Sequence, residues 1–153
     1  MADFALETHG ARVISTRCSE TYYSSAGFPL FGFRRFGFPR WYPSESPSIV
    51  IQGSPVLLAG QCWPFHGAQG TLLISLSHPI TVSHVTLDHI PRYNSPTGRI
   101  DSAPRDLQVY GMREESEEGS LLGTFTYDEN GESTQTFKLP ISSVVYVTRP
   151  YAK

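Results

Sequence analysis

The sequence has no long apolar run and no strong charge of either sign. None of its hydrophobic stretches approaches the roughly 20 residues that a membrane-spanning helix needs. Residues 1–10 lack the basic start and the apolar middle of a signal peptide. We therefore expect a soluble chain, with any targeting or spanning segment lying outside it. The net charge of -2 gives no electrostatic reason to expect nucleic-acid binding.

Cysteine is scarce, and this limits the kinds of stabilising site. Cys18 and Cys62 are the two cysteines, too few for a disulfide framework, and their separation matches no zinc motif. From the residues alone, the simplest interpretation is a pair of reduced, partly buried thiols.

Signatures of catalysis are missing as well. No G-x-S-x-G nucleophile elbow occurs. Residues 32–37 have the glycine spacing of a phosphate-binding loop without its Lys and Ser/Thr. On one strand, His84 and His89 would point to opposite faces, which disfavours a shared metal. Cys18 could act with a histidine, but spacing selects none of the five, so we expect no enzyme.

What remains is the composition of one globular all-β domain. The hydrophobic fraction is 39% and the aromatic fraction 12% over 153 residues, enough for one core and too apolar for a disordered chain. Short β-type runs are separated by Pro, Gly and Ser, which predicts a β-sandwich. The expected strands are residues 48–52, 71–76, 81–87, 107–111, 121–127 and 134–139, and residues 143–148 could add another.

Two local features refine this prediction. Residues 3–8 are a candidate lead-in helix that Gly10 would stop. Residues 134–139 alternate with a period of two, as expected for a strand with one wet face. Asn130 and Gly131 precede them, and both residue types tolerate the positive φ of tight turns, so we expect strands 121–127 and 134–139 to form a hairpin.

Residues 22–47 form an unusually long aromatic-rich segment. Gly, Pro and Ser are interspersed there with nine aromatic residues. Long ordered loops in compact domains are commonly functional. Two interpretations stay open: a hydrophobic flap lying on the core, and a flap that closes over a partner, where exposed aromatics supply contact area.

Four ordered blocks of sequence resemble the SUN domain family. They are GARVISTRCSETY from Gly10, CWPFHGAQG from Cys62, DSAPRDLQVYG from Asp101 and LLGTFTYDENGESTQTF from Leu121. The sequences of these blocks are most similar to those of the broadly expressed members of the family. The resemblance implies a jelly-roll-like antiparallel β-sandwich of the galactose-binding type, trimeric through an upstream coiled coil, that binds the C-terminal tail of nesprin-like KASH proteins in the perinuclear space. Such a protein links the inner and outer nuclear membranes, and so the nucleus to the cytoskeleton.

The resemblance also implies a site. Residues 22–44 would be the family's lid, with the KASH tail added as a strand between lid and core. His89 and Ser102 match positions that line the peptide pocket, with Ser102 helping to hold the terminal carboxylate. The alternative for His89 is a histidine hydrogen-bonded at a strand end. The lid residues expected to touch the tail are Phe31, Phe33, Phe36, Phe38, Trp41 and Tyr42.

Two further family features involve the cysteines and a cation. Cys18 matches the position that forms an intermolecular disulfide with a KASH cysteine, a reaction suited to an oxidising lumen. Residues 49–62 match the cation loop, whose backbone carbonyls hold a monovalent ion, potassium in relatives. Cys62 matches the cysteine that clamps this loop, and its partner is absent. The carbonyls expected to bind the ion belong to Ile49, Gln52, Ser54 and Gln61.

The resemblance covers residues 10–139, and the chain departs from it afterwards. Residues 1–9 would be the lead-in from the coiled coil, and residues 140–153 a divergent tail lacking the second cysteine and two pocket tyrosines. A missing closing strand would expose an unpaired edge, so we expect reduced stability. Two alternatives therefore stay open: a truncated SUN variant with impaired KASH binding, and a carbohydrate-binding, discoidin-like β-sandwich.

Overall fold

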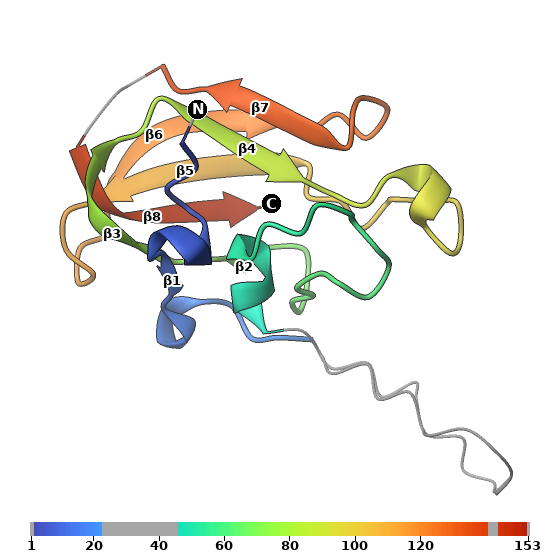
Figure 1. Cartoon of the computed structure of the whole chain (residues 1–153), viewed down its shortest axis with the longest axis horizontal. Coiled ribbons are helices and arrows are strands. Elements are labelled where there is room, and N and C mark those ends of the chain that lie inside the picture. The colour runs from blue at the N-terminus through green and yellow to red at the C-terminus, as the bar shows by residue number, and fades with distance from the viewer. Residues whose placement is uncertain (1, 23–45, 141–143, 153) are drawn as a thin grey trace, which may run out of the picture.

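The computed structural model describes residues 2–22, 46–140 and 144–152, and these form two antiparallel sheets that face one another (Figure 1). The larger sheet has the order β1-β3-β8-β5-β6, with β2 also paired to β8, and the smaller sheet is the pair β4-β7. The strands are β1 (Arg12–Val13), β2 (Gly70–Thr71), β3 (Ile74–Thr81), β4 (His84–Asp88), β5 (Asp106–Met112), β6 (Ser120–Thr126), β7 (Thr134–Lys138) and β8 (Val144–Ala152). The short 3-10 helices are η1 (Glu7–His9), η2 (Ser15–Arg17), η3 (Pro47–Ile51) and η4 (Arg92–Asn94).

The small sheet shows why these residues form strands. In β7, Gln135 and Phe137 are partly buried while their neighbours are exposed, which confirms the predicted period of two. β4 has the same alternation and pairs with β7 in full register, with Val85 opposite Phe137. On the solvent-exposed face of this pair, the hydroxyl oxygens of Thr86 and Thr136 lie 2.9 Å apart. One face of this pair therefore belongs to the interior.

The main core lies between the two sheets. Val109 and Leu122 of the large sheet are buried with Val82 and Leu139, which flank the small sheet, and Phe125 packs against them. A second cluster lies around β1 and the start of β3, where Ile51 and Trp63 meet Ala11, Leu72 and Ile74. Leu76 of β3 packs against both clusters, so the two are continuous along this strand. No helix among the described residues is long and apolar enough to cross a membrane.

The predicted hairpin is wrong. β6 pairs with β5, and β7 pairs with β4, so the two strands belong to different sheets. The rings of Phe125 and Phe137 stack at 5.0 Å between centroids, which shows that the strands pack face to face across the core. Gly131 does turn the chain, with its N–H donating to the Asp128 carbonyl at 3.0 Å, but its φ is not positive. Burial of both phenylalanines outweighs the local hairpin signal.

Two other local predictions need correction. Residues 48–52 form η3 rather than a strand, because Pro47 begins a 3-10 turn that buries Ile51. The lead-in helix is reduced to the single turn η1. Gly10 does end it, with a φ of 89° that other residues rarely adopt. The remaining predicted strands are present, although residues 71–76 are divided between β2 and β3 and the 81–87 strand begins at His84.

Residues 144–152 provide a central strand of the larger sheet. β8 pairs with β3 on one side and with β5 on the other, and Val147 lies opposite both Ser75 and Met112. The expected unpaired edge after Leu139 is therefore wrong. The possible strand at residues 143–148 is confirmed and extends further than predicted.

Candidate functional site

A polar and aromatic brace joins residues 21–22 to residues 63–66. Thr21 and Phe65 form an isolated antiparallel bridge, and the backbone N–H of Tyr22 donates to the Pro64 carbonyl at 2.9 Å. The indole N–H of Trp63 donates to the Thr21 hydroxyl at 3.1 Å. The rings of Tyr22 and His66 meet edge to face at 5.0 Å. Residue 22, where the predicted lid begins, is therefore fixed to the body of the domain.

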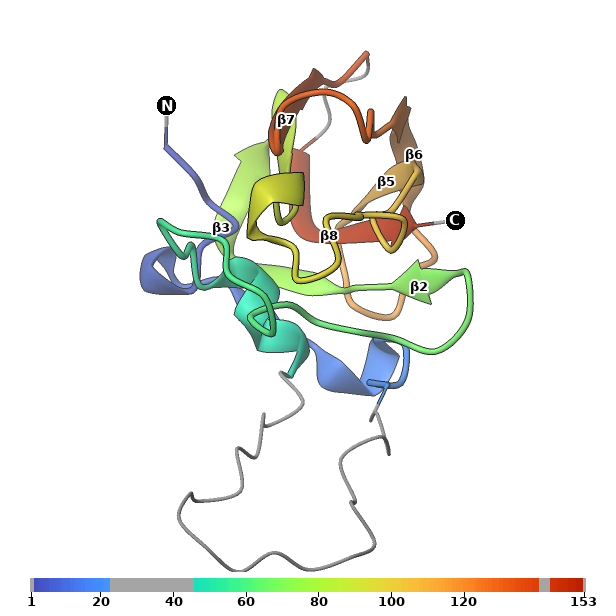
Figure 2. The same cartoon turned by 90° about the vertical axis from the view of Figure 1, so that its right-hand side faces the viewer.

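The far end of that segment is fixed as well. η3 begins at Pro47, and Ile51 at its end has only 3% of its surface exposed. Ile51 packs with Ala11 and Ile74 beneath the large sheet. The blue segment that follows β1 and the teal η3 lie on the same side of the molecule in both views (Figures 1 and 2). The predicted lid residues Phe31, Phe33, Phe36, Phe38, Trp41 and Tyr42 lie outside the described part of the chain.

Cys18 lies directly after η2, between β1 and the start of β3. Its thiol donates to the Ile14 carbonyl at 3.3 Å and accepts from the Leu73 N–H at 3.4 Å. Burial raises the pKa of the Cys18 thiol, and the Leu73 hydrogen bond offsets only part of this effect. The sulfur is half-buried, so the group is a protonated thiol held at the base of the brace rather than an activated nucleophile.

Residues 52–62 form an irregular, mostly exposed loop. Gly53 and Gly60 both have positive φ, and the Ile49 carbonyl accepts the N–H of Gln52 at 3.3 Å. Gln52, Ser54 and Gln61 are exposed, as is Cys62. Residues 49–62 carry no acidic side chain, so neutral oxygens are their only ligands for a cation. Among the described residues, no group of three His, Cys, Asp or Glu could hold a metal ion. Neutral oxygens fit a weakly charged monovalent ion better than a divalent one.

His89 and Ser102 lie on the connection between β4 and β5. The half-buried His89 follows β4, its ring Nδ1 donates to the Ile90 carbonyl at 3.1 Å, and its backbone N–H donates to the Ser133 carbonyl at 3.0 Å. Burial lowers the pKa of His89, and the Ile90 hydrogen bond offsets part of that shift. Ser102 is exposed in a turn before β5. No hydrogen bond joins these two residues in the described part of the chain.

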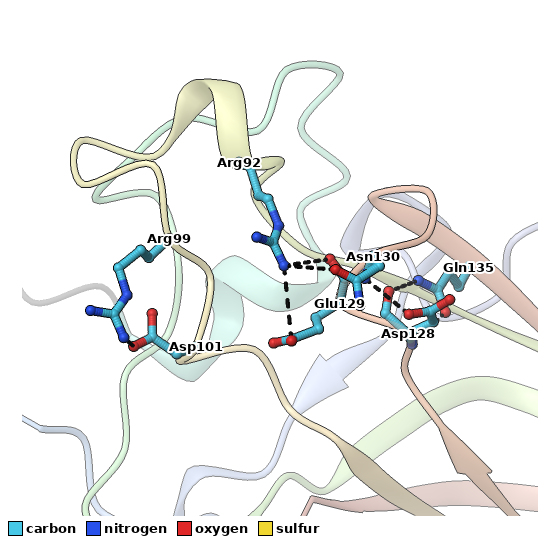
Figure 3. Close-up of polar contacts among 7 residues, drawn as sticks. All are labelled: Arg92, Arg99, Asp101, Asp128, Glu129, Asn130 and Gln135. Carbon is cyan, nitrogen blue, oxygen red and sulfur yellow. Dashed lines mark hydrogen bonds and ion pairs between the residues drawn. The ribbon is translucent and has the colours of Figure 1, made fainter.

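Arginines that the sequence analysis missed border this connection (Figure 3). Arg92 of η4 reaches across to the β6–β7 loop, donating to the side chain of Asn130 at 3.0 Å and lying 3.9 Å from the Glu129 carboxylate. Arg99 pairs with Asp101 at 2.9 Å, one residue before Ser102. Only the three-dimensional fold brings Arg92 to the β6–β7 loop, so no spacing in the sequence could have revealed it.

A pocket of about 330 Å³ opens between the irregular loop and η4. Its walls come from residues 54–57, from Pro91, Tyr93 and Asn94, and from the paired ends of β4 and β7. Of the predicted site residues that the structure describes, Ser54 alone contributes to it. Neither His89 nor Ser102 lines it, although His89 follows Asp88 of its wall.

Comparison with known families and proteins gives a consistent result. The family model described as Sad1 / UNC-like C-terminal matches residues 40–149. The chain is 51% identical to SUN domain-containing protein 1 of Homo sapiens over 139 residues, covering 90% of this chain and 17% of that protein. It is 46% identical to SUN domain-containing protein 2 of Mus musculus over 145 residues, covering 94% of this chain and 19% of that protein. Nuclear migration and anchoring protein unc-84 of Caenorhabditis elegans is 38% identical over 138 residues, with coverages of 88% and 12%.

Among solved structures, the fold is similar to a family 32 carbohydrate-binding module from Streptococcus pneumoniae EndoD. The TM-score is 0.60 at 15% identity, covering 99% of this chain and 86% of that one. At this identity the likeness concerns the fold alone, and it confirms the predicted galactose-binding-like β-sandwich. The family match includes residues 140–149, which the sequence analysis assigned to a divergent tail.

Proposed function

The chain belongs to the Sad1/UNC-like family of SUN domains, and on that premise we propose that it is an adaptor that binds the C-terminal tail of a KASH protein. The tail would lie in the perinuclear space, and the complex would link the inner and outer nuclear membranes, joining nucleus to cytoskeleton. The chain spans less than a fifth of the length of the three relatives named above. Membrane anchoring and trimerisation through a coiled coil are therefore proposed for the longer protein.

The observation that carries the proposal is the anchoring of both ends of residues 23–45. The Trp63–Thr21 hydrogen bond and the Tyr22–Pro64 backbone bond hold one end, and the burial of Ile51 holds the other. A segment whose flanking residues are held against the body of the domain can close over an extended peptide and add it as a strand. Main-chain hydrogen bonds would then supply affinity, and side-chain pockets would supply selectivity.

Each remaining site residue has a proposed role. The exposed hydroxyl of Ser102 would donate to the terminal carboxylate of the tail, and the neutral His89 would border the peptide groove. Cys18 would form the disulfide with a cysteine of the tail: its sulfur bonds to the partner's sulfur, and the two electrons and two protons pass to the oxidising agents of the lumen. The neutral oxygens of residues 49–62 would hold a potassium ion that orders this loop.

The family relationship also supports a non-catalytic role. The curated relatives are named for the SUN domain or for nuclear migration and anchoring rather than for a reaction. An adaptor needs a stable scaffold and a selective groove, and it needs no activated nucleophile. The raised pKa of Cys18 is consistent with a chain that has no activated thiol at this position.

The test is a titration of the chain with two tail peptides, one ending in its native carboxylate and one extended by a single residue. We expect the extension to weaken binding by about tenfold or more, because it removes a charge-assisted hydrogen bond to Ser102. Ser102→Ala should reduce affinity for the native tail and leave the weak binding of the extended tail unchanged. Equal affinity for both tails would contradict the proposal.

Two rival functions predict other results for the same chain, one in glycan binding and one in thermal melting. Preferential binding of glycans would favour a carbohydrate-binding module. An uncooperative melting curve with no ligand binding would favour an impaired SUN variant. The central position of β8, paired on both sides, supports a cooperatively folded sheet instead.

A further inference from the structure

The pocket between residues 54–57 and η4 is built from two segments that are both tied down. The side-chain amide of Asn94 donates to the Leu57 carbonyl at 3.1 Å, which joins η4 to the irregular loop. On the other side of η4, Arg92 holds the β6–β7 loop through Asn130 and Glu129 (Figure 3). These contacts fix both walls before any ligand arrives. Its volume of about 330 Å³ is at the lower end of the range of small-molecule sites, roughly 300–1,000 Å³.

The chemistry of the pocket favours one kind of occupant. Asp88 is the one charged side chain in the lining formed by the described residues. The ion pairs in this part of the chain join Arg92 to Glu129 and Arg99 to Asp101, so none of them neutralises Asp88. Asp88 is also one of the charges that raise the pKa of Tyr127, after the larger effect of burial. Asp88 therefore supplies negative charge at this end of β4.

The rest of the lining fits a long side chain with a cationic head. Pro55, Val56 and Pro91 offer apolar walls for a methylene stem, and Ser54 and Ser133 add hydroxyl oxygens that can accept hydrogen bonds. Tyr93 has 85% of its surface exposed. A solvent-exposed aromatic ring at the rim of a pocket can form a cation–π contact with a bound cation.

We propose that this pocket binds an arginine or lysine side chain of a protein partner, with Asp88 as the counter-charge and Tyr93 as the stacking surface. Because Asp88 and His89 are consecutive at the end of β4, the bound side chain would lie beside the proposed peptide groove. The pocket would then select tails that carry a basic residue. Selection of tails with a basic residue rests on the proposed function, whereas binding of the basic side chain by the pocket does not.

The test uses two small probes and nuclear magnetic resonance of the whole chain. N-acetyl-arginine methylamide and its citrulline counterpart have the same shape, but only arginine is charged. We expect arginine to shift the signals of residues 54–57, 88 and 91–94, with citrulline binding at least about tenfold more weakly. Asp88→Asn and Tyr93→Ala should each weaken arginine binding by about fivefold or more.

The variants are chosen to leave the fold intact. Asp88 pairs with Thr134 through the backbone, which Asn preserves, and the exposed Tyr93 contributes little to the core. Glu118→Gln is the matched control, because it removes the same charge from the exposed β5–β6 loop at the opposite end of the molecule (Figure 1). It should leave arginine binding unchanged.

Three results would overturn the inference: equal affinity for citrulline, full affinity of Asp88→Asn, or shifts confined to other residues. Shifts of the same residues by a neutral sugar but not by arginine would assign the pocket to a glycan instead. The tail titration separates this inference from the proposed function. Arginine binding to the pocket together with equal affinity for both tails would support the pocket and contradict the adaptor role. Absence of arginine binding together with weaker binding of the extended tail would contradict the pocket and support the adaptor role.

Discussion

At the scale of single residues, Leu121 and Leu122 are adjacent in β6 but have opposite environments. Leu122 has 1% of its surface exposed and belongs to the core between the sheets, whereas Leu121 is 44% exposed. We expect Leu122→Ala to lower the free energy of unfolding by about 2–5 kcal/mol, because it leaves a cavity. Leu121→Ala should cost less than about 1 kcal/mol. Urea unfolding measures both, and equal losses would contradict the assignment of the two faces.

His89 should make stability depend on pH. Burial lowers its pKa in the folded chain below the ordinary value of 6.5, so the unfolded chain takes up a proton first as the pH falls. The neutral side chain therefore stabilises the fold above about pH 6.5, and this contribution is lost as the pH falls through the lower, folded pKa.

The measurement is the free energy of unfolding at a series of pH values from 8 down to 5. His89→Gln should flatten part of the decline below pH 6.5, since the group that protonates is gone. His84→Gln is the control, because His84 is exposed at the start of β4. An unchanged slope in the His89 variant would show that burial does not disfavour its charged form.

Cys18 should react slowly with thiol reagents. Its pKa is raised by burial, and its sulfur is engaged with the backbone of Ile14 and Leu73, so little thiolate is available at pH 7.5. We expect iodoacetamide to alkylate Cys18 several-fold more slowly than N-acetylcysteine, with the rate rising towards the small-molecule value in denaturant. Peptide mass spectrometry gives the rate, and a rate equal to that of N-acetylcysteine in the folded chain would contradict the burial.

Single residues were also where sequence reasoning reached its limit. Resemblance gave His89, Ser102 and Cys18 as candidates, yet their roles depend on a partner and remain predictions. Arg92 and Tyr93 carried no signal, because their importance comes from contacts with Asn130 and with the pocket wall. Those contacts join residues about 40 positions apart, which no local pattern encodes.

At the scale of elements, the brace at the foot of the predicted lid can be tested by a double-mutant cycle. Trp63→Phe and Thr21→Val each remove one side of the 3.1 Å hydrogen bond. We expect a coupling of about 0.5–1.5 kcal/mol in the free energy of unfolding, the net value of a typical hydrogen bond. Thr124→Val, at an exposed position of β6, is the control for the loss of a hydroxyl. Strictly additive effects would mean that the hydrogen bond contributes nothing.

The elements themselves were predictable where one local signal was strong. The alternation in residues 134–138 and the short β-type runs at residues 107–111 and 121–127 gave strands close to those observed. The partners of those strands were not predictable. A turn at Asn130 and Gly131 suits a hairpin, but the chain crosses between sheets there so that Phe125 and Phe137 can stack. Tertiary burial decided the pairing, as it decided the 3-10 form of residues 47–51.

At the scale of the whole molecule, the continuous core and the fixed residues on either side of 23–45 form the scaffold on which the proposed added strand would dock. β8 gives that scaffold a central strand, which was not evident from the sequence because residues 144–152 resemble none of the four SUN-domain blocks. Composition had already indicated one globular domain, and the short β-type runs separated by Pro, Gly and Ser had indicated a β-sandwich. The family match and the structural likeness then agreed on the same β-sandwich.

The most direct test of the adaptor account is amide hydrogen exchange of the whole chain with and without a KASH tail peptide. The account predicts that the tail slows amide exchange in residues 22–45 and in residues 61–66, which include one side of the brace, because an added strand forms backbone hydrogen bonds. Exchange in β6, on the far edge of the large sheet, should not change. Unchanged exchange across residues 22–45 at saturating tail would contradict the account.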